Sequence, residues 1–322
     1  MSDRYPCGTL KRRAFLGAAA AAAGAPWIGR GPVRAGAIDD PAGATAHGPK
    51  VEKSKFDLPG LYPGRVVEVK NGAMIGEGQK KDREAIKASL DKGLTTLTGA
   101  DDAVSAWRTF FEPGDVVGIK VVPNGYPHSF SSYELVLETI EGLKACGVKP
   151  TDIFVYERFR SEMQGAGYDK ILPDGVRWGG LTAANAPQVQ LDFDGFKNDP
   201  IAGYDRDVYI QMDLVHYGED PRDDRQYRSH IGKLLTRVCN KIVAIPCLKD
   251  HRSAGVTGAL KNISHGSVNN VERSHANAFT NTCNQFIPQV VSHPLLRSKF
   301  VLQIMDGLRG IYNGGPQGTK DG

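Results

Sequence analysis

Apolar and polar positions along the chain follow two periods that separate helices from strands. Apolar residues recur every three or four positions over 82–97, 101–111 and 131–148, and aspartate or serine stands where each segment begins. This spacing and these capping residues predict three helices. β-Branched apolar runs at 115–122 and 152–158 have the composition of buried parallel strands. The order strand, helix, strand therefore predicts a βαβ unit with a right-handed crossover.

Two more apolar runs, 241–248 and 300–308, extend the same pattern toward the C-terminus. They predict an α/β fold in which a mostly parallel sheet is flanked by helices, Rossmann-like and doubly wound. The stretch between 178 and 227 is less regular and predicts a β-containing insertion. Shorter patterns predict strands at 64–70, 188–194 and 206–212, a charged loop at 217–230, and helices at 160–172, 231–240 and 281–300.

The first 37 residues have the order of a cleavable export signal. Lys11-Arg12-Arg13 is followed by Phe15-Leu16, by a weakly apolar alanine run, and by Ala35-Gly36-Ala37. This order resembles a twin-arginine translocation signal. The run from Ala14 to Ile28 is shorter than the roughly 20 apolar residues of a stable transmembrane anchor. We therefore expect a periplasmic or otherwise exported protein, with the twin-arginine translocation machinery as a partner.

Residues 38–62 are rich in proline, glycine and lysine and predict a linker, which leaves 63–322 as a single α/β domain. The twin-arginine pathway carries proteins that have already folded. This route therefore favours a cofactor, or a redox partner protein, that is acquired before export.

The charge of the chain is concentrated in the export signal. Residues 1–37 hold six lysines and arginines and one aspartate, a net charge of +5, whereas the whole chain carries +4. The remainder therefore carries −1. This balance gives no electrostatic reason to expect a nucleic-acid partner.

Four cysteines lie beyond the signal: Cys146, Cys239, Cys247 and Cys283. Their spacing contains no CxxC pair and no ferredoxin-type run, so a ferredoxin-type iron–sulfur cluster is not expected. Three states stay open for them, namely buried thiols, one disulfide in an oxidising compartment, or metal ligation.

Polar residues accompany the predicted strands at their carboxyl ends. Lys120 lies inside one apolar run, Lys249 and His251 follow another, and Asp306 stands near the end of a third. Because ligands of open parallel sheets bind outside the carboxyl ends of the strands, we expect these side chains to meet at one site. Lys120 would bind the ligand, and Lys249, His251 and Asp306 would be catalytic. A structural ion pair for Lys120 and a capping role for Asp306 are the alternatives.

The segment "AGVTGALKN" at 254–262 predicts a glycine-rich turn that opens a helix. Gly255 and Gly258 would let the backbone approach a ligand closely, and the first N–H groups of the helix favour an anion. Thr257, Lys261 and Asn262 add a hydroxyl, a charge and an amide. The spacing matches neither the Walker A nor the dinucleotide-binding pattern. It therefore predicts only an anion site, for a phosphate or a carboxylate.

His251, His265 and His275 fall within 25 residues of one another. Neutral imidazole suits both metal ligation and proton transfer near neutral pH. None of the three pairs has the i, i+4 spacing of a helical zinc motif. A metal site made by these histidines, an acid/base role, and simple hydrogen bonding to loop backbone therefore stay open.

Several segments resemble the family called domain of unknown function 362. The resemblance rests on "VVGIKVV", "ELVLETIEGLKACGVKPTDIFVYER", "IPCLKDHRSAGVTGALKN" and "IMDGLRGIYNGGP", and it spans roughly 113–316 with gaps. It implies no established reaction. Some members carry ferredoxin-like iron–sulfur modules, whose cysteines this chain lacks. The family pattern is also expected to continue past Gly322, so the resemblance implies a truncated domain.

A second similarity is to the amino-terminal domain of nickel-pincer lactate racemases. In those enzymes, glycine-rich turns with lysine and histidine form the cofactor site. This similarity implies a metal-organic cofactor as an alternative to a single metal ion.

Together these patterns predict an exported, cofactor- or metal-dependent enzyme of redox type. It would bind an anionic small molecule around Lys249, His251 and Lys261. A periplasmic binding protein without chemistry and an accessory or maturation partner of a redox enzyme are the alternatives.

Overall fold

A five-stranded parallel sheet lies at the centre of the structure, a computed structural model that describes residues 44–183, 193–195, 199, 201–212, 227–275 and 282–315. The strand order is β10-β7-β2-β3-β4, and every neighbouring pair is parallel. These strands are β2 (Val117–Lys120), β3 (Ile153–Phe159), β4 (Arg177–Thr182), β7 (Lys241–Ala244) and β10 (Phe300–Gln303). The predicted runs are apolar because the sheet is buried on both faces.

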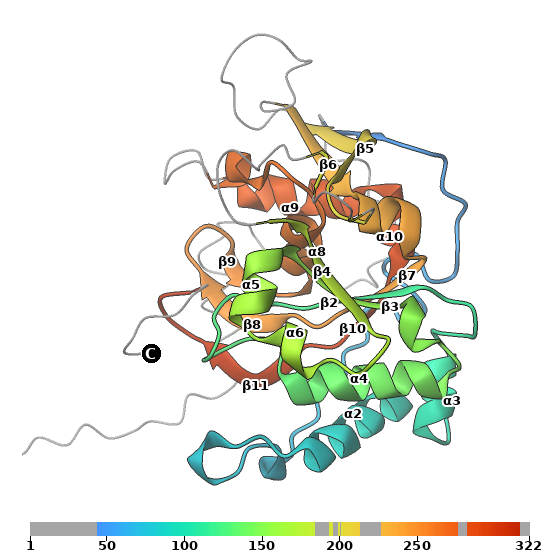
Figure 1. The fold of residues 1–322 in the computed structure, drawn as a ribbon, viewed down its shortest axis with the longest axis vertical. Coiled ribbons are helices and arrows are strands. Elements are labelled where there is room, and N and C mark those ends of the chain that lie inside the picture. The colour runs from blue at the N-terminus through green and yellow to red at the C-terminus, as the bar shows by residue number, and fades with distance from the viewer. Residues whose placement is uncertain are drawn as a thin grey trace, which may run out of the picture. The chain divides into compact units, whose positions relative to one another are not determined.

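Helices cover both faces of this sheet (Figure 1). One face carries α2 (Arg83–Thr98), α3 (Ala103–Arg108) and α4 (Tyr133–Ala145), and the other carries α8 (Ala259–Ser267), α9 (Cys283–Ser292) and α10 (Pro294–Lys299). Side chains of β3 alternate between the two cores, Ile153 and Val155 toward the first, Phe154 and Tyr156 toward the second. The predicted α/β fold with helices on both faces is therefore confirmed.

The first two predicted helices begin where their capping residues indicated. Asp82 accepts a hydrogen bond from the Ala85 amide at 2.9 Å, and Asp102 accepts one from the Ser105 amide at 2.8 Å. Each carboxylate satisfies a backbone N–H that has no partner inside the helix. The α2 helix ends at Gly99, which adopts a left-handed conformation at φ 78°.

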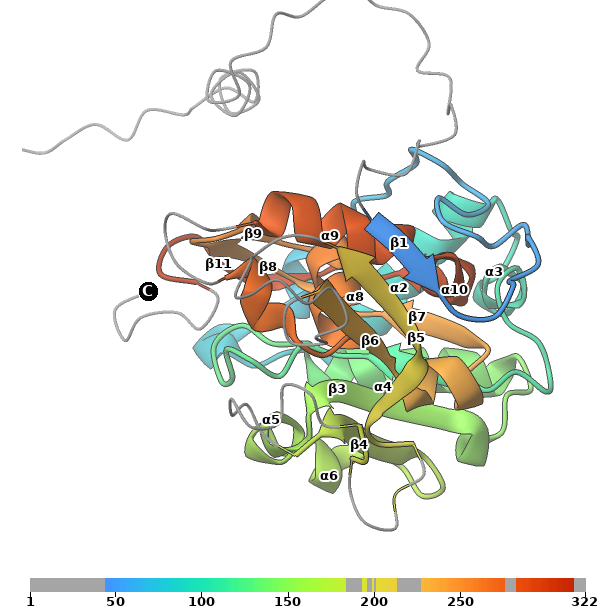
Figure 2. The ribbon, with the colours of Figure 1, turned by 90° about the horizontal axis from the view of Figure 1, so that it is seen from above.

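A small antiparallel sheet lies beside the helices of the second face (Figure 2). Its order is β1-β5-β6, with β1 (Ala44–His47), β5 (Tyr204–Met212) and β6 (Arg228–Gly232). The strand predicted at 206–212 is therefore present. The stretch expected to be a linker contains β1, because this strand finds a partner in β5. Similarly, the end of the predicted charged loop belongs to β6.

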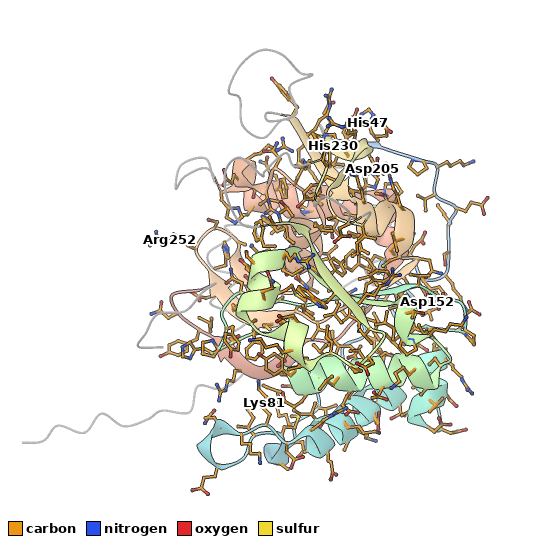
Figure 3. The ribbon with its side chains drawn as sticks, in the orientation of Figure 1. His47, Lys81, Asp152, Asp205, His230 and Arg252 are labelled. Atoms are coloured by element: carbon orange, nitrogen blue, oxygen red, sulfur yellow. The ribbon has the colours of Figure 1, made fainter. Side chains whose placement is uncertain are left out.

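Each strand of this small sheet carries one polar side chain that is labelled in Figure 3: His47 in β1, Asp205 in β5 and His230 in β6. The His47 ring stacks on Tyr209 at 4.4 Å between centroids, and Asp205 forms an ion pair with Arg237 at 2.9 Å. The helix predicted at 231–240 is reduced to the short π-helix η5 (Leu234–Val238), because β6 extends to Gly232.

The two C-terminal apolar runs each divide between two sheets, which corrects the prediction of single strands. After Ala244 and after Gln303 the chain leaves the central sheet and enters a three-stranded sheet of order β11-β8-β9. This sheet consists of β8 (Cys247–His251), β9 (Gly255–Thr257) and β11 (Asp306–Ile311). Pro246 stands at the first break and has no N–H to donate to a ladder. Arg252 lies in the turn between β8 and β9 (Figure 3).

The prediction of a strand at 64–70 is wrong. The segment makes no sheet pairing with the described residues, and the Val66 side chain is 89% exposed. Its alternation of apolar and polar residues therefore has no neighbouring strand to pair with. The remaining elements are η1 (Gly72–Met74), η2 (Glu77–Gln79), η3 (Pro150–Asp152), α5 (Arg160–Gly165), α6 (Tyr168–Ile171) and η6 (Val271–Ser274).

Residues 1–37, the predicted export signal, lie outside the described residues, as does most of the strand predicted at 188–194. In the described part of the chain, no helix has the length and apolar character to cross a membrane.

Candidate anion and metal site

A cavity of about 330 Å³ lies at the carboxyl ends of β2 and β3, against α8. Its walls come from the ends of these strands, from α5, from β8 and β9, and from α8 and η6. The volume is at the lower end of the range of roughly 300–1,000 Å³ for small-molecule sites. We call this cavity the pocket.

Seven of the residues predicted for ligand, catalytic or metal roles line the pocket, and four do not. The seven are Lys120, Lys249, Thr257, Lys261, Asn262, His265 and His275. Gly255, Gly258, His251 and Asp306 lie outside its lining. The pocket therefore gathers the lysines and the amide, whereas two of the three residues expected to be catalytic do not face it.

Lys120 is fully buried and makes three hydrogen bonds. Its ammonium group donates to a Glu157 carboxylate oxygen, to the Val121 carbonyl at 2.8 Å, and to Asn262 Oδ1 at 2.9 Å. Because an ammonium group has three N–H donors, none is left for a ligand. Lys120 therefore holds Glu157 and Asn262 in place. The α8 helix comes this close because Gly266 has no side chain: a Cβ there would lie 2.8 Å from the Lys120 ammonium.

Lys249 is the second buried lysine. Its ammonium group donates to the Asn124 carbonyl, and burial lowers its pKa. The loop after β2 passes over this lysine at Gly125, which has φ +102° and whose Cβ would lie 2.6 Å from Lys249 Nζ and 2.5 Å from the Ser129 carbonyl oxygen. Only glycine adopts this conformation in the available space. Lys249 therefore fixes the loop that carries Asn124.

Buried polar atoms without partners point to a ligand. Thr257 Oγ1 and Asn262 Nδ2 have no hydrogen-bond partner among the described residues, although each of the two residues is only 7% exposed. Lys261 adds an ammonium group whose pKa burial lowers to about 8. Native proteins satisfy nearly all buried polar groups with protein, water or a bound molecule, so these two groups are available to a molecule that enters the cavity.

Two carboxylates of the pocket, Glu157 and Glu162, were not predicted from the sequence. Burial, and then the nearby Glu157 charge, raise the pKa of Glu162 to about 7, against the opposing effects of Lys120, Arg158 and a hydrogen bond with Asn124. Glu162 therefore exchanges a proton near neutral pH. Glu157 lies near the carboxyl end of β3, as Lys120 lies at the carboxyl end of β2. This position could have indicated that Glu157 belongs to the site. Glu162 lies in a predicted helix whose orientation the pattern did not reveal.

A cluster of two histidines and a cysteine adjoins the pocket. The ligand atoms of His265, His275 and Cys283 all lie within 4.8 Å of one another. Burial lowers the pKa of both imidazoles and raises that of the Cys283 thiol. His265 and His275 were among the predicted metal ligands. Cys283 was open to that role but was not assigned to it.

All four cysteines are buried thiols in the described part of the chain, without a disulfide. Burial raises the pKa of Cys146 to about 11 and those of Cys239 and Cys247 to about 12. These three thiols are therefore uncharged near neutral pH, and they are not part of the histidine cluster.

His251 and Asp306 have structural partners. His251 Nδ1 accepts hydrogen bonds from the Ser253 and Ala254 amides, which closes the turn between β8 and β9, and its ring lies 5.3 Å from that of His275. Burial, with the Lys261 charge, lowers the His251 pKa to about 4. Asp306 Oδ2 accepts from the amide and the hydroxyl of Ser132, both at 2.7 Å, at the start of α4.

Comparison with known families places most of the pocket inside the region that one family model matches. The sequence model of a family described as domain of unknown function (DUF362) matches residues 127–321. The chain belongs to the DUF362 family. Of the pocket, only Lys120, Val122 and Asn124 precede the matched region. No curated protein matches the chain. Membership in DUF362 assigns no reaction, so the chemistry must be argued from the pocket.

Proposed function

We propose that this DUF362 protein is an exported, metal- or cofactor-dependent enzyme that binds a small anionic molecule in the pocket. The observation that carries the proposal is the pair of unsatisfied buried donors, Thr257 Oγ1 and Asn262 Nδ2, in a cavity that Lys261 also lines. A phosphate or carboxylate oxygen would accept hydrogen bonds from all three groups.

The charges of the pocket support an anion rather than a cation. The Lys120 charge is balanced by Glu157, its ion-pair partner. Glu162 is uncharged below its pKa of about 7, whereas Lys261 keeps its charge up to about pH 8. Lys249 contributes a further ammonium group. Arg158 and Glu272 also line the pocket and their charges offset each other, so near neutral pH the lysines outweigh the carboxylates, and this excess is greatest on the acidic side.

Glu162 favours an enzyme over a protein that only binds. A general acid or base works best when its pKa lies near the working pH, and the Glu162 carboxyl lines the same cavity as the anion-binding groups. A simple binding protein has no need of a group that takes up and releases a proton there. We therefore assign the proton-transfer role to Glu162, rather than to Asp306 or to the histidines for which the sequence left it open.

Replacing Lys261 with methionine is expected to weaken anion binding by about 10- to 100-fold. The substitution keeps the length of the apolar stem and removes one charged hydrogen bond, which contributes about 1.5–3 kcal/mol. Calorimetric titration with inorganic phosphate and with oxalate measures the effect.

Lys144→Met is the matched control. Lys144 lies on the exposed side of α4, where its ammonium group pairs with Glu141 at 2.9 Å. This variant should bind both probes as the wild type does. If the wild type binds neither probe, or if Lys261→Met binds them unchanged, the anion-binding proposal is wrong.

Export is proposed from the twin-arginine pattern. Changing Arg12 and Arg13 together to lysine should keep the protein in the cytoplasmic fraction, because the receptor reads the arginine pair as an address. Immunoblots of cell fractions measure this, and a variant with Arg30 and Arg34 changed to lysine is the control that should still be exported. Equal periplasmic amounts of both variants would contradict the export proposal.

A further inference from the structure

We infer that His265, His275 and Cys283 bind one zinc ion, with a fourth coordination position open to the pocket. Neither family membership nor the pattern of the sequence assigns this set of ligands. A catalytic role for this zinc rests on the proposed function, because zinc would be the metal that such an enzyme uses. Its geometry, however, comes from side chains other than those that would bind the anion.

The two sulfur–nitrogen distances in the cluster are close to those of a tetrahedral site. Cys283 Sγ lies 3.7 Å from His275 Nε2 and 4.0 Å from His265 Nε2. With zinc–nitrogen bonds of about 2.05 Å and a zinc–sulfur bond of about 2.3 Å, tetrahedral geometry places nitrogen and sulfur about 3.6 Å apart. The sulfur–nitrogen distances would therefore change by only a few tenths of an ångström, while the two nitrogens, which lie within 4.8 Å of each other, would close to about 3.3 Å.

Hydrogen bonds at the other ring nitrogens orient both histidines. His275 Nδ1 lies 2.9 Å from Ser274 Oγ and 3.4 Å from the Val271 carbonyl oxygen, which can only accept. His265 Nδ1 lies 2.9 Å from Ser264 Oγ, and its Nε2 lies 3.0 Å from Ser274 Oγ, a contact that a metal ion would replace. A proton on each Nδ1 leaves the Nε2 lone pair for a metal, and partners of this kind are what hold metal-binding imidazoles in position.

The chemistry of the donors favours zinc over other common ions. Imidazole nitrogen and thiolate sulfur suit borderline and soft metals, whereas magnesium and calcium require oxygen ligands. Two histidines and a cysteine also occur in blue-copper sites, which are built for electron transfer. Here the two histidines line a cavity for a small molecule. Three protein ligands beside a cavity are typical of catalytic zinc, which keeps its fourth position for water or substrate.

The position of the cluster couples it to the pocket. His265 and His275 line the same cavity as Lys261 and Glu162. When bound, zinc would supply a Lewis acid that polarises an oxygen of the ligand. Lys261 and Thr257 would hold the anion, and Glu162 would hold or release a proton. The ligand class that fits this combination is a small carboxylate or phosphate ester with an oxygen that the metal can bind.

Zinc content and cobalt spectroscopy test the inference. The purified protein, dialysed against zinc and then against metal-free buffer, should retain about one zinc per chain. Cobalt titrated into the metal-free protein should give visible bands of tetrahedral intensity and a thiolate-to-cobalt charge-transfer band in the near ultraviolet. Cys283→Ser should lose the charge-transfer band, and His275→Ala should bind zinc at least tenfold more weakly.

Cys146→Ser is the matched control, because Cys146 is also a buried thiol but lies outside the cluster. It should keep both the zinc and the charge-transfer band. The inference is overturned if the wild type retains no zinc, if its cobalt complex lacks the thiolate band, if copper is the metal retained by protein purified from the exported fraction, or if Cys283→Ser keeps the band. The cobalt spectrum of the wild type tests thiolate ligation by itself, even if a variant fails to fold.

The two proposals fail separately. Lys261→Met should bind phosphate about 10- to 100-fold more weakly and keep zinc, whereas Cys283→Ser should lose zinc and keep phosphate binding to the lysines. If the wild type retains zinc but does not bind phosphate, only the anion site is contradicted. If the wild type retains no zinc but binds phosphate, only the zinc site is contradicted.

Discussion

Replacing Lys120 with methionine is expected to lower the free energy of unfolding by about 3–5 kcal/mol. The substitution leaves the Glu157 carboxylate without its ion-pair partner at a site where the Glu157 side chain is only 11% exposed. Breaking a buried ion pair by removing one member costs this much because the remaining charge is neither solvated nor balanced. Asn262 would also lose the hydrogen bond that holds its Oδ1.

The double variant Lys120→Met, Glu157→Gln distinguishes the ion pair from simple packing. Removing both charges leaves no unbalanced carboxylate, so this variant should recover at least half of the stability that the single variant loses. Urea unfolding followed by circular dichroism measures the wild type, Lys120→Met, Glu157→Gln and the double variant. If the double variant is as unstable as the sum of the single variants, the cost arises from packing rather than from the unpaired charge.

Gly180→Ala is expected to cost about 3 kcal/mol, at the upper end of the range for an overpacked core. Gly180 lies in β4 directly beneath the start of α5. A Cβ there would overlap the Arg160 backbone N and lie 2.7 Å from Arg160 Cα, and a backbone yields less readily than a side chain. The Ser161 amide also donates to the Ala183 carbonyl at 2.9 Å, which ties α5 to β4. The substitution should therefore displace the helix that carries Glu162.

The neighbouring glycine provides the control. A Cβ on Gly179 would have nothing within 4 Å, and this residue is not in the left-handed region, so Gly179→Ala should change stability by less than about 1 kcal/mol. Thermal unfolding compares the two variants. Equal stability of the two proteins would show that the close approach of β4 to α5 is not a constraint.

The sequence indicated the lysines of the site because they occupy positions that need an explanation. Lys120 interrupts an apolar strand, and Lys249 and Lys261 border a glycine-rich turn, so local pattern was enough to single them out. The pattern could not distinguish a lysine that binds a ligand from one whose donors are all used inside the protein. That difference depends on Glu157 and Asn262, which reach Lys120 only in the folded chain.

Other parts of the site depend on contacts that no local pattern contains. Cys283 meets His265 because α9 packs against α8, and that packing has no period in the sequence. Asp306 was placed at a ligand site because the apolar run around it reads as one strand. The chain instead changes sheets there, and the carboxylate binds Ser132 at the start of α4.

The two halves of the site differ in how far apart their members lie along the chain. Lys120 and Asn262 are separated by 142 positions, and Lys249 and Asn124 by 125. His265 and Cys283 are only 18 positions apart. Closing a long loop costs more entropy than closing a short one, so the histidine–cysteine set carries the smaller closure cost. Thr257, Lys261 and Asn262 are themselves close in the chain, but the pocket around them is complete only when the strands that carry Lys120 and Lys249 are in place, so anion binding depends on the completely folded sheet.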